Sequence, residues 1–141
     1  MSPFSPSVEY TIEGDAHVIN EHRNASRYLC EGKMTAWGTA AFAPRDKVRL
    51  DDPYLSPTLH PFSAPVPIFV HAGGAEVMVD SIRGFADAMR QVAGNRIEYL
   101  ETPNVPHDIY GGGHIAGWKK GQEDVVEAAA VFVRIALSSV V

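Results

Sequence analysis

Two hydrophobic patterns alternate in the second half of the chain, and each predicts one kind of element. Residues 67–71 are a short apolar run followed by small turn-forming residues at 72–75, which is typical of a buried strand that ends in a turn. Apolar residues then recur every three or four positions over residues 79–93, which predicts an amphipathic helix that stops at Gly94. Residues 96–100 predict a second strand. This order of elements predicts a β-α-β unit with two parallel strands.

The first half of the chain predicts short helices joined by irregular segments. Residues 1–13 show no sustained period and are expected to form a loop. A helix is expected from an N-cap at Asp15 to a stop at Gly32, because the apolar residues between them follow helical spacing. A shorter helical piece is expected over residues 35–42. Five prolines over residues 53–67 argue against a regular element there.

The end of the chain predicts a loop followed by one long helix. Three consecutive glycines lie between Tyr110 and His114, and we expect a loop there because glycine loses much conformational entropy in a regular element. From Gln122 onward, the apolar residues fall on one side of a helix that is expected to pack on the same sheet. These residues are Val125, Val126, Ala129, Phe132, Val133, Ala136 and Leu137.

Length, charge and hydropathy narrow the class of protein. The 141 residues suit one domain, which we expect to consist of a peripheral loop and helical segment, residues 1–65, and a β-α-β-loop-α core, residues 66–141. The net charge is −5 and no basic run is longer than Lys119-Lys120, which argues against nucleic-acid or anionic-membrane binding. The chain has neither a signal-peptide pattern nor an apolar run of about 18 residues. We therefore expect a cytoplasmic protein without a transmembrane segment.

An acid and a histidine follow the two predicted strands. Glu76 comes just after the first strand, and His107 ends a proline-containing loop after the second. The carboxyl ends of neighbouring parallel strands meet at one edge of a sheet, where ligands of α/β proteins bind. A carboxylate that accepts the Nδ1 proton of an imidazole prepares Nε2 to take a proton from a nucleophile. The alternative is that Glu76 only caps the following helix and that His107 is a solvated loop residue.

Four motifs add a family resemblance to this pair: residues 1–4, 52–57, 66–80 and 106–108. Their sequences and order resemble the C-terminal half of the hormone-sensitive-lipase-like branch of the α/β-hydrolases, especially its fungal members. The resemblance implies an α/β class protein with a partial α/β-hydrolase fold, in which a short, mostly parallel sheet made of the last strands is flanked by helices. It also implies hydrolysis of small-molecule carboxylic esters, with Glu76 as the triad acid and His107 as the general base. The family more often has Asp where this chain has Glu76.

The nucleophile and the oxyanion loop of that family are not found among the 141 residues. No serine lies in a Gly-x-Ser-x-Gly motif, and the run of residues 111–114 reverses the order of the family's His-Gly-Gly-Gly loop. Because these parts supply the covalent step and the oxyanion stabilisation, the chain alone is expected not to hydrolyse esters. Two hypotheses remain: a portion of a serine carboxylesterase or lipase, and a catalytically inactive half-hydrolase that acts as a binding or regulatory partner. In both, an unpaired sheet edge is expected to favour self-association.

Other candidate residues carry weaker signals. Cys30 is the single cysteine, and its predicted place at the end of a helix disfavours the reactive thiolate. Asp80 is expected to help hold the turn after Glu76 rather than to take part in catalysis. A metal site would have to be assembled from histidines that show no helical i, i+4 spacing, so we expect no metal and no cofactor. These histidines are His60, His71, His107 and His114.

Overall fold

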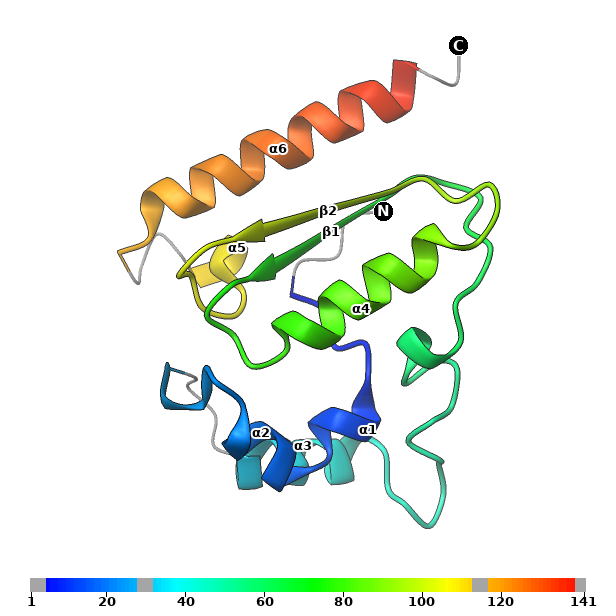
Figure 1. Ribbon diagram of the computed structural model, residues 1–141, viewed down its shortest axis with the longest axis vertical. Helices are drawn as coiled ribbons and strands as arrows, with labels where there is room; N and C mark the ends of the chain where they lie inside the picture. Colours follow the sequence, from blue (N-terminus) through cyan, green and yellow to red (C-terminus); the bar gives the residue numbers. More distant parts are fainter. Residues whose placement is uncertain (1–4, 28–31, 113–116, 139–141) are drawn as a thin grey trace.

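The computed structural model describes residues 5–27, 32–112 and 117–138. Its centre is a two-stranded sheet formed by β1 (Ile68–Gly73) and β2 (Ile97–Thr102), which pair in parallel. Helix α4 (Val79–Arg90) connects the strands and covers one face of the sheet, and α6 (Lys119–Ser138) covers the other (Figure 1). The predicted α/β class and the predicted parallel β-α-β unit are therefore confirmed.

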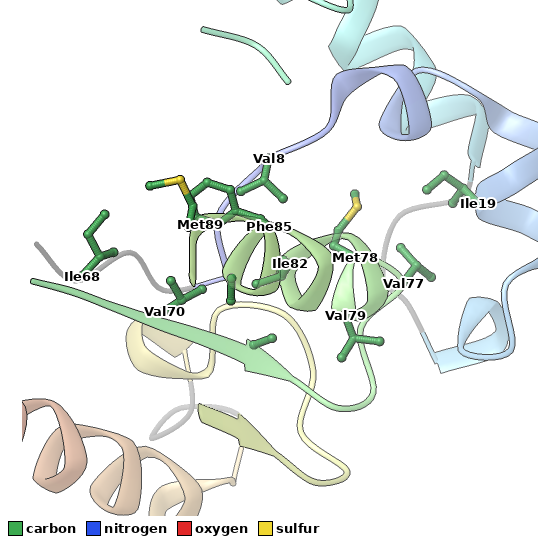
Figure 2. Packing of buried hydrophobic residues seen from close by; sticks show 12 residues of the cluster. Val8, Ile19, Ile68, Val70, Val77, Met78, Val79, Ile82, Phe85 and Met89 are labelled. Carbon is green, nitrogen blue, oxygen red and sulfur yellow. The ribbon is translucent and has the colours of Figure 1, made fainter. Parts of the chain in front are cut away.

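The main hydrophobic core lies between β1 and α4. All of β1 is buried, because helices cover both faces of the strand. Helix α4 turns its apolar stripe, which includes Ile82 and Met89, toward the strand. Figure 2 shows that Val8 from the N-terminal segment and Ile19 from α2 reach the same cluster. The N-terminal segment thus packs against the hydrophobic core formed by β1 and α4.

The opposite face of β1 contacts α6 through one aromatic pair. The rings of Phe69 and Phe132 have centroids 5.6 Å apart. Of the apolar side predicted for α6, Val125 and Phe132 are buried, whereas Val126 and Val133 remain about half exposed and Leu137 is 66% exposed. The prediction that this helix packs on the same sheet is confirmed, although part of its apolar side remains exposed. Within the described ranges, no helix combines the length and the apolar character needed to cross a bilayer.

The N-terminal segment is more helical at its start than the sequence predicts. Helix α1 (Tyr10–Glu13) forms one turn inside the segment expected to be a loop, closed by backbone hydrogen bonds that return to the carbonyls of residues 9 and 10. The prediction of a loop throughout residues 1–13 is wrong there. One turn of four residues is too short to leave a hydrophobic period in the sequence.

Helix α2 (Ala16–Glu21) begins as predicted but ends early. The Asp15 side chain accepts hydrogen bonds from the amides of residues 17 and 18, as expected of an N-cap. The helix ends at Glu21 rather than at Gly32, because His22 is extended and the following Asn24 donates two hydrogen bonds to the turn after β1. A single 3-10 turn, η1 (Ala25–Arg27), follows.

The remaining elements are short, apart from α3. Helix α3 (Gly32–Phe42) includes the predicted residues 35–42 and starts three residues earlier. The proline-rich connection contains one 3-10 turn, η2 (Pro57–Leu59). Proline is its first residue, where the backbone N–H would have no partner within the helix, so the proline costs no hydrogen bond.

The glycine-rich segment after the second strand also differs from its prediction. Helix α5 (Ile109–Gly112) is a single turn where a loop was expected. Ile109 is buried against Val105 and Val125, and the Gln122 side chain donates a 2.6 Å hydrogen bond to the Tyr110 carbonyl. These tertiary contacts outweigh the entropic cost of the glycines. The rest of the predicted loop, with His114, lies outside the described residues.

Candidate active site

Glu76 lies in the turn between β1 and α4, and its carboxylate is the centre of a hydrogen-bond network. The residue is fully buried. Its Oε1 accepts hydrogen bonds from the Gly73 amide at 2.6 Å and from the Ser5 hydroxyl at 3.1 Å. Its Oε2 lies 2.7 Å from Nδ1 of His107. Three donors from separate segments thus hold one buried carboxylate, as burial of a charged group requires.

The helix-capping alternative for Glu76 does not match this geometry. Met78 occupies the N-cap position of α4 and makes no side-chain capping hydrogen bond. The Glu76 side chain turns back to Gly73 instead of reaching the first amides of the helix. The structure therefore orients this carboxylate toward the sheet edge and His107.

His107 reaches Glu76 because the loop after β2 runs close beside the turn after β1. Main-chain hydrogen bonds continue past the strands, from the Gly74 amide to the Thr102 carbonyl and from the Ala75 amide to the Val105 carbonyl, both at 2.9 Å. A Cβ atom added at Gly73 would lie 2.3 Å from the Pro106 carbonyl oxygen. Only a residue without a side chain lets the two segments approach this closely.

The loop has an unusual backbone on both sides of His107. Asn104 has a φ of +60° and Asp108 a φ of +52°. Asn and Asp tolerate this left-handed region better than most other residues with a side chain. The Asp108 amide also donates a 3.2 Å hydrogen bond to the Ser5 hydroxyl, so one serine links the histidine loop to the carboxylate.

The electrostatics of the pair favour a protonated imidazole. The hydrogen bond to Glu76 raises the pKa of His107 above its ordinary value of 6.5, and burial acts in the opposite direction. The His107 side chain is 41% exposed, so its ring is open to solvent while the acid is not. A carboxylate that holds the Nδ1 proton leaves the lone pair of the neutral ring on Nε2.

We expect this pair to make folding stability depend on pH. Because the folded pKa of His107 lies above 6.5, the protonated ring contributes stability that is fully present below pH 6.5 and is lost as pH rises through the raised pKa. Urea unfolding of the wild-type chain and of His107→Gln over this range measures the contribution as the difference between the two pH profiles. Parallel profiles for the two proteins would contradict the expectation.

A comparison with known protein families identifies the family to which this chain belongs. Residues 1–111 match a family model described as the alpha/beta hydrolase fold. The chain belongs to this α/β hydrolase fold family. A search of curated proteins gave no match.

Solved structures with similar folds include several esterases. Brefeldin A esterase, described as a bacterial homologue of human hormone-sensitive lipase, has a TM-score of 0.73 and 17% identity over 93% of this chain and 37% of its own length. An esterase of Pyrobaculum calidifontis has a TM-score of 0.72 and 20% identity over 96% and 43%. An α/β hydrolase enzyme from the metagenome of Lake Arreo, Spain, has a TM-score of 0.66 and 25% identity over 86% and 38%. This chain thus spans less than half the length of each of these α/β hydrolases.

The sequence analysis did not identify two polar residues that hold the segments carrying Glu76 and His107. Ser5 joins Glu76 to the histidine loop, as described above. The Asn24 side chain is buried and donates hydrogen bonds to the carbonyls of Gly74 at 3.0 Å and Glu76 at 2.9 Å, which fixes the turn that carries the acid. Both lie 50 or more positions from these partners, so no local spacing marks them.

Asp80 forms ion pairs at the surface that fix the first turn of α4. Its carboxylate pairs with the guanidinium of Arg23, with Nε2 of His22 at 3.1 Å and with Arg83 at 3.0 Å. The Arg23 hydrogen bond is the main cause that holds the pKa of Asp80 well below its usual value. These contacts tie the segment after α2 to the first turn of α4, in agreement with the predicted structural role of Asp80.

The other candidate residues do not join the pair. His71 is fully buried in β1, where its Nε2 lies 3.0 Å from the Thr102 hydroxyl and burial lowers its pKa. His60 is exposed, with Nε2 at 2.8 Å from the Asp51 carbonyl oxygen. Cys30 and His114 lie outside the described residues. In the part of the chain that the structure covers, no three potential ligands come together to hold a metal ion.

Proposed function

We propose that this chain supplies the acid and the general base of a serine carboxylic-ester hydrolase, with Glu76 and His107 in these roles. The observation that carries the proposal is the 2.7 Å contact between Glu76 Oε2 and His107 Nδ1 at the carboxyl ends of adjacent parallel strands. A buried carboxylate fixes the tautomer of the imidazole and stabilises the imidazolium that forms during the reaction. Among the solved structures with a similar fold, brefeldin A esterase and the Pyrobaculum calidifontis esterase support the same chemistry.

In the proposed mechanism, the Nε2 atom of His107 moves the proton. It accepts the proton of a serine hydroxyl as that oxygen attacks the ester carbonyl, and it returns the proton to the alcohol that leaves. Water then follows the same path and releases the acid. The serine and the oxyanion donors come from residues other than these 141, as in a longer hydrolase in which this chain is the C-terminal part.

The chain by itself is expected to lack esterase activity. A fluorophosphonate probe reacts with an activated serine, and no serine here lies in the nucleophile motif. We therefore expect neither p-nitrophenyl acetate hydrolysis above the buffer rate nor labelling of the purified chain. Covalent labelling of one of its serines, found by mass spectrometry, would contradict this division of roles.

A chimera tests the proposal directly. Residues 5–141 would replace the structurally matching portion of an esterase of solved structure, which then provides the nucleophile and the oxyanion loop. We expect the chimera to hydrolyse p-nitrophenyl acetate and His107→Gln to reduce kcat by a factor on the order of 10³ or more. The matched control is His60→Gln, which removes an exposed histidine away from the pair and should leave the rate unchanged. A His107→Gln chimera with the full rate would overturn the proposal.

A second candidate is an inactive half-hydrolase that acts by association, and the surface of α6 favours it. Val126, Val133 and Leu137 expose apolar side chains, and the sheet in the described part of the chain has only two strands. Exposed apolar groups and open strand edges promote self-association. We expect light scattering of the purified chain to show oligomers at micromolar concentration. A monodisperse monomer with a sharp, reversible melting transition would contradict this expectation.

A further inference from the structure

A single serine hydroxyl connects the two segments that carry the acid–histidine pair, Glu76 and His107. Ser5 is 5% exposed, and its Oγ lies 3.1 Å from Oε1 of Glu76 and 3.2 Å from the amide nitrogen of Asp108. The Ser5 amide also donates a 2.9 Å hydrogen bond to the His71 carbonyl in β1. The residue is therefore fixed to the strand through its backbone and to both segments of the pair through its side chain.

Hydrogen-bond chemistry fixes the direction in which this hydroxyl points. An amide N–H can only donate, so Asp108 uses its N–H on a lone pair of Ser5 Oγ. An ionised carboxylate can only accept, so the hydroxyl gives its one proton to Oε1 of Glu76. The result is a chain of one direction, from the peptide bond that follows His107 to the carboxylate. In such a chain each hydrogen bond strengthens the next.

The same contact determines which carboxylate oxygen faces the imidazole. Oε1 of Glu76 accepts hydrogen bonds from both Ser5 and the Gly73 amide. Because a carboxylate is planar and rigid, two donors on Oε1 also fix the direction of Oε2, which lies 2.7 Å from Nδ1 of His107. The Nδ1 proton therefore meets an acceptor whose position is set in advance.

The histidine loop is held on both sides of His107. Before it, the Val105 carbonyl accepts a 2.9 Å hydrogen bond from the Ala75 amide, and after it, the Asp108 amide donates to Ser5. The His107 side chain is 41% exposed, so solvent borders part of the ring. An anchor one residue away limits the positions that Nε2 can occupy. A general base needs this limit, because small errors in placement cost much of the rate.

The backbone of Ser5 is unusual for a residue with a side chain. Its φ is +43°, in the left-handed region that glycine adopts without steric cost. A glycine would therefore suit this backbone better, but it would bring no hydroxyl to Glu76. Unfavourable backbone conformations cluster at functional sites. The hydroxyl, rather than the backbone, thus accounts for a serine at this position.

We propose that Ser5 is a positioning residue of the ester hydrolase, whose hydroxyl orients Glu76 and the histidine loop so that Nδ1 of His107 keeps its proton and Nε2 is free to act as the base. The catalytic part rests on the proposed function, whereas the effect on the His107 ring is a property of this chain alone. Ser5 acts through the pair, because it is buried and bonds Oε1 of Glu76 rather than the oxygen beside His107.

Two variants delete the hydroxyl with different effects on the backbone. Ser5→Ala keeps a Cβ atom at positive φ, whereas Ser5→Gly relieves the strain and should fold even if the first variant is destabilised. In two-bond ¹H–¹⁵N correlations at a pH where the His107 ring is neutral, we expect the wild-type ring to be protonated on Nδ1 and both variants to show a fraction protonated on Nε2. The matched control is Ser7→Ala, which removes an exposed hydroxyl from the same segment and should leave the ring unchanged.

The chimera gives the kinetic measurement. We expect Ser5→Ala and Ser5→Gly each to lower kcat for p-nitrophenyl acetate by about tenfold to a hundredfold, because Nε2 is placed less accurately. KM should change by less than about twofold, since Ser5 acts behind the pair and not on the ester. Active sites are counted with the fluorophosphonate probe, so a smaller amount of folded enzyme is not mistaken for a lower kcat. Ser7→Ala should leave both constants unchanged.

A purely structural role of Ser5 gives a different result. It would lower the stability of the variants without changing kcat for each active site or the tautomer of His107. In a chimera that depends on His107, a Ser5→Gly variant in which either the tautomer or kcat stays as in the wild type would overturn the inference. Loss of the fold in both Ser5 variants would also overturn it, because the hydroxyl would then serve the fold alone.

These outcomes are distinct from the test of the proposed function. A chimera that depends on His107 but keeps its full rate in Ser5→Gly would refute the role of Ser5 and leave the ester hydrolase role intact. A chimera that does not need His107 would refute the ester hydrolase role. A changed tautomer in the Ser5 variants of the chain alone would then still assign the orientation of the His107 ring to Ser5.

Discussion

Glu76→Ala is expected to lower the free energy of unfolding by about 3 kcal/mol, because it removes a fully buried carboxylate and leaves its donors without an acceptor. The Gly73 amide loses its 2.6 Å partner, and the Ser5 hydroxyl and His107 lose theirs. The value is at the lower end for a broken buried pair because the His107 ring is partly solvated. Urea unfolding at neutral pH measures the change.

Two further variants define the cause of this loss. Glu98→Ala removes an exposed acid from β2 and should change the stability by less than about 0.5 kcal/mol. Glu76→Gln keeps the shape and an acceptor for Gly73 but removes the charge, so it should lose less stability than Glu76→Ala while the pKa of His107 falls. If Glu76→Ala were no more destabilising than Glu98→Ala, the network around Glu76 would not contribute to the fold.

Gly73→Ala is expected to lower the free energy of unfolding by a similar amount, through a steric clash rather than the loss of a charge. The new Cβ would lie 2.3 Å from the Pro106 carbonyl oxygen and 2.6 Å from that of Val105, so the histidine loop has to move. Forcing a backbone shift in a packed region costs about 2 to 3 kcal/mol. Because the shift separates His107 from Glu76, the pKa of His107 should also return toward its ordinary value.

The chain offers a matched control for this substitution. At Gly84, in the middle of α4, the nearest atom to an added Cβ is the Thr58 methyl group at 3.9 Å. Gly84→Ala should therefore stabilise the chain by about 0.5 to 1 kcal/mol, as alanine favours a helix more than glycine does. A Gly73→Ala chain with wild-type stability and an unchanged pKa of His107 would show that the close approach is not required.

The central part of the fold could be predicted because its signals are local. Consecutive apolar residues in β1 and the regular period of α4 belong to each element alone, so they need no knowledge of the surroundings. The position of Glu76 beside His107 followed from geometry, since parallel neighbouring strands end at one edge. The 2.7 Å distance between their side chains agrees with that prediction.

The supporting contacts could not be predicted because they join distant parts of the chain. Ser5 and Asn24 reach the turn at Glu76 from 71 and 52 positions away, and no local spacing links either residue to that turn. The Asn24 contacts also end α2 at Glu21, and the packing of Ile109 against Val105 and Val125 forms the single turn of α5. Tertiary packing decides such short elements, and sequence propensity is only a weak guide to them.

The protonation of the His107 ring shows whether Glu76 holds the Nδ1 proton and leaves Nε2 free to act as the base. Two-bond ¹H–¹⁵N correlations of the ¹⁵N-labelled chain report which ring nitrogen carries the proton, and their pH dependence gives the pKa of the ring. We expect a neutral ring protonated on Nδ1, a pKa of His107 above 6.5 and a lower pKa in Glu76→Gln. A neutral ring protonated on Nε2, with a pKa at or below 6.5 that Glu76→Gln does not change, would contradict it.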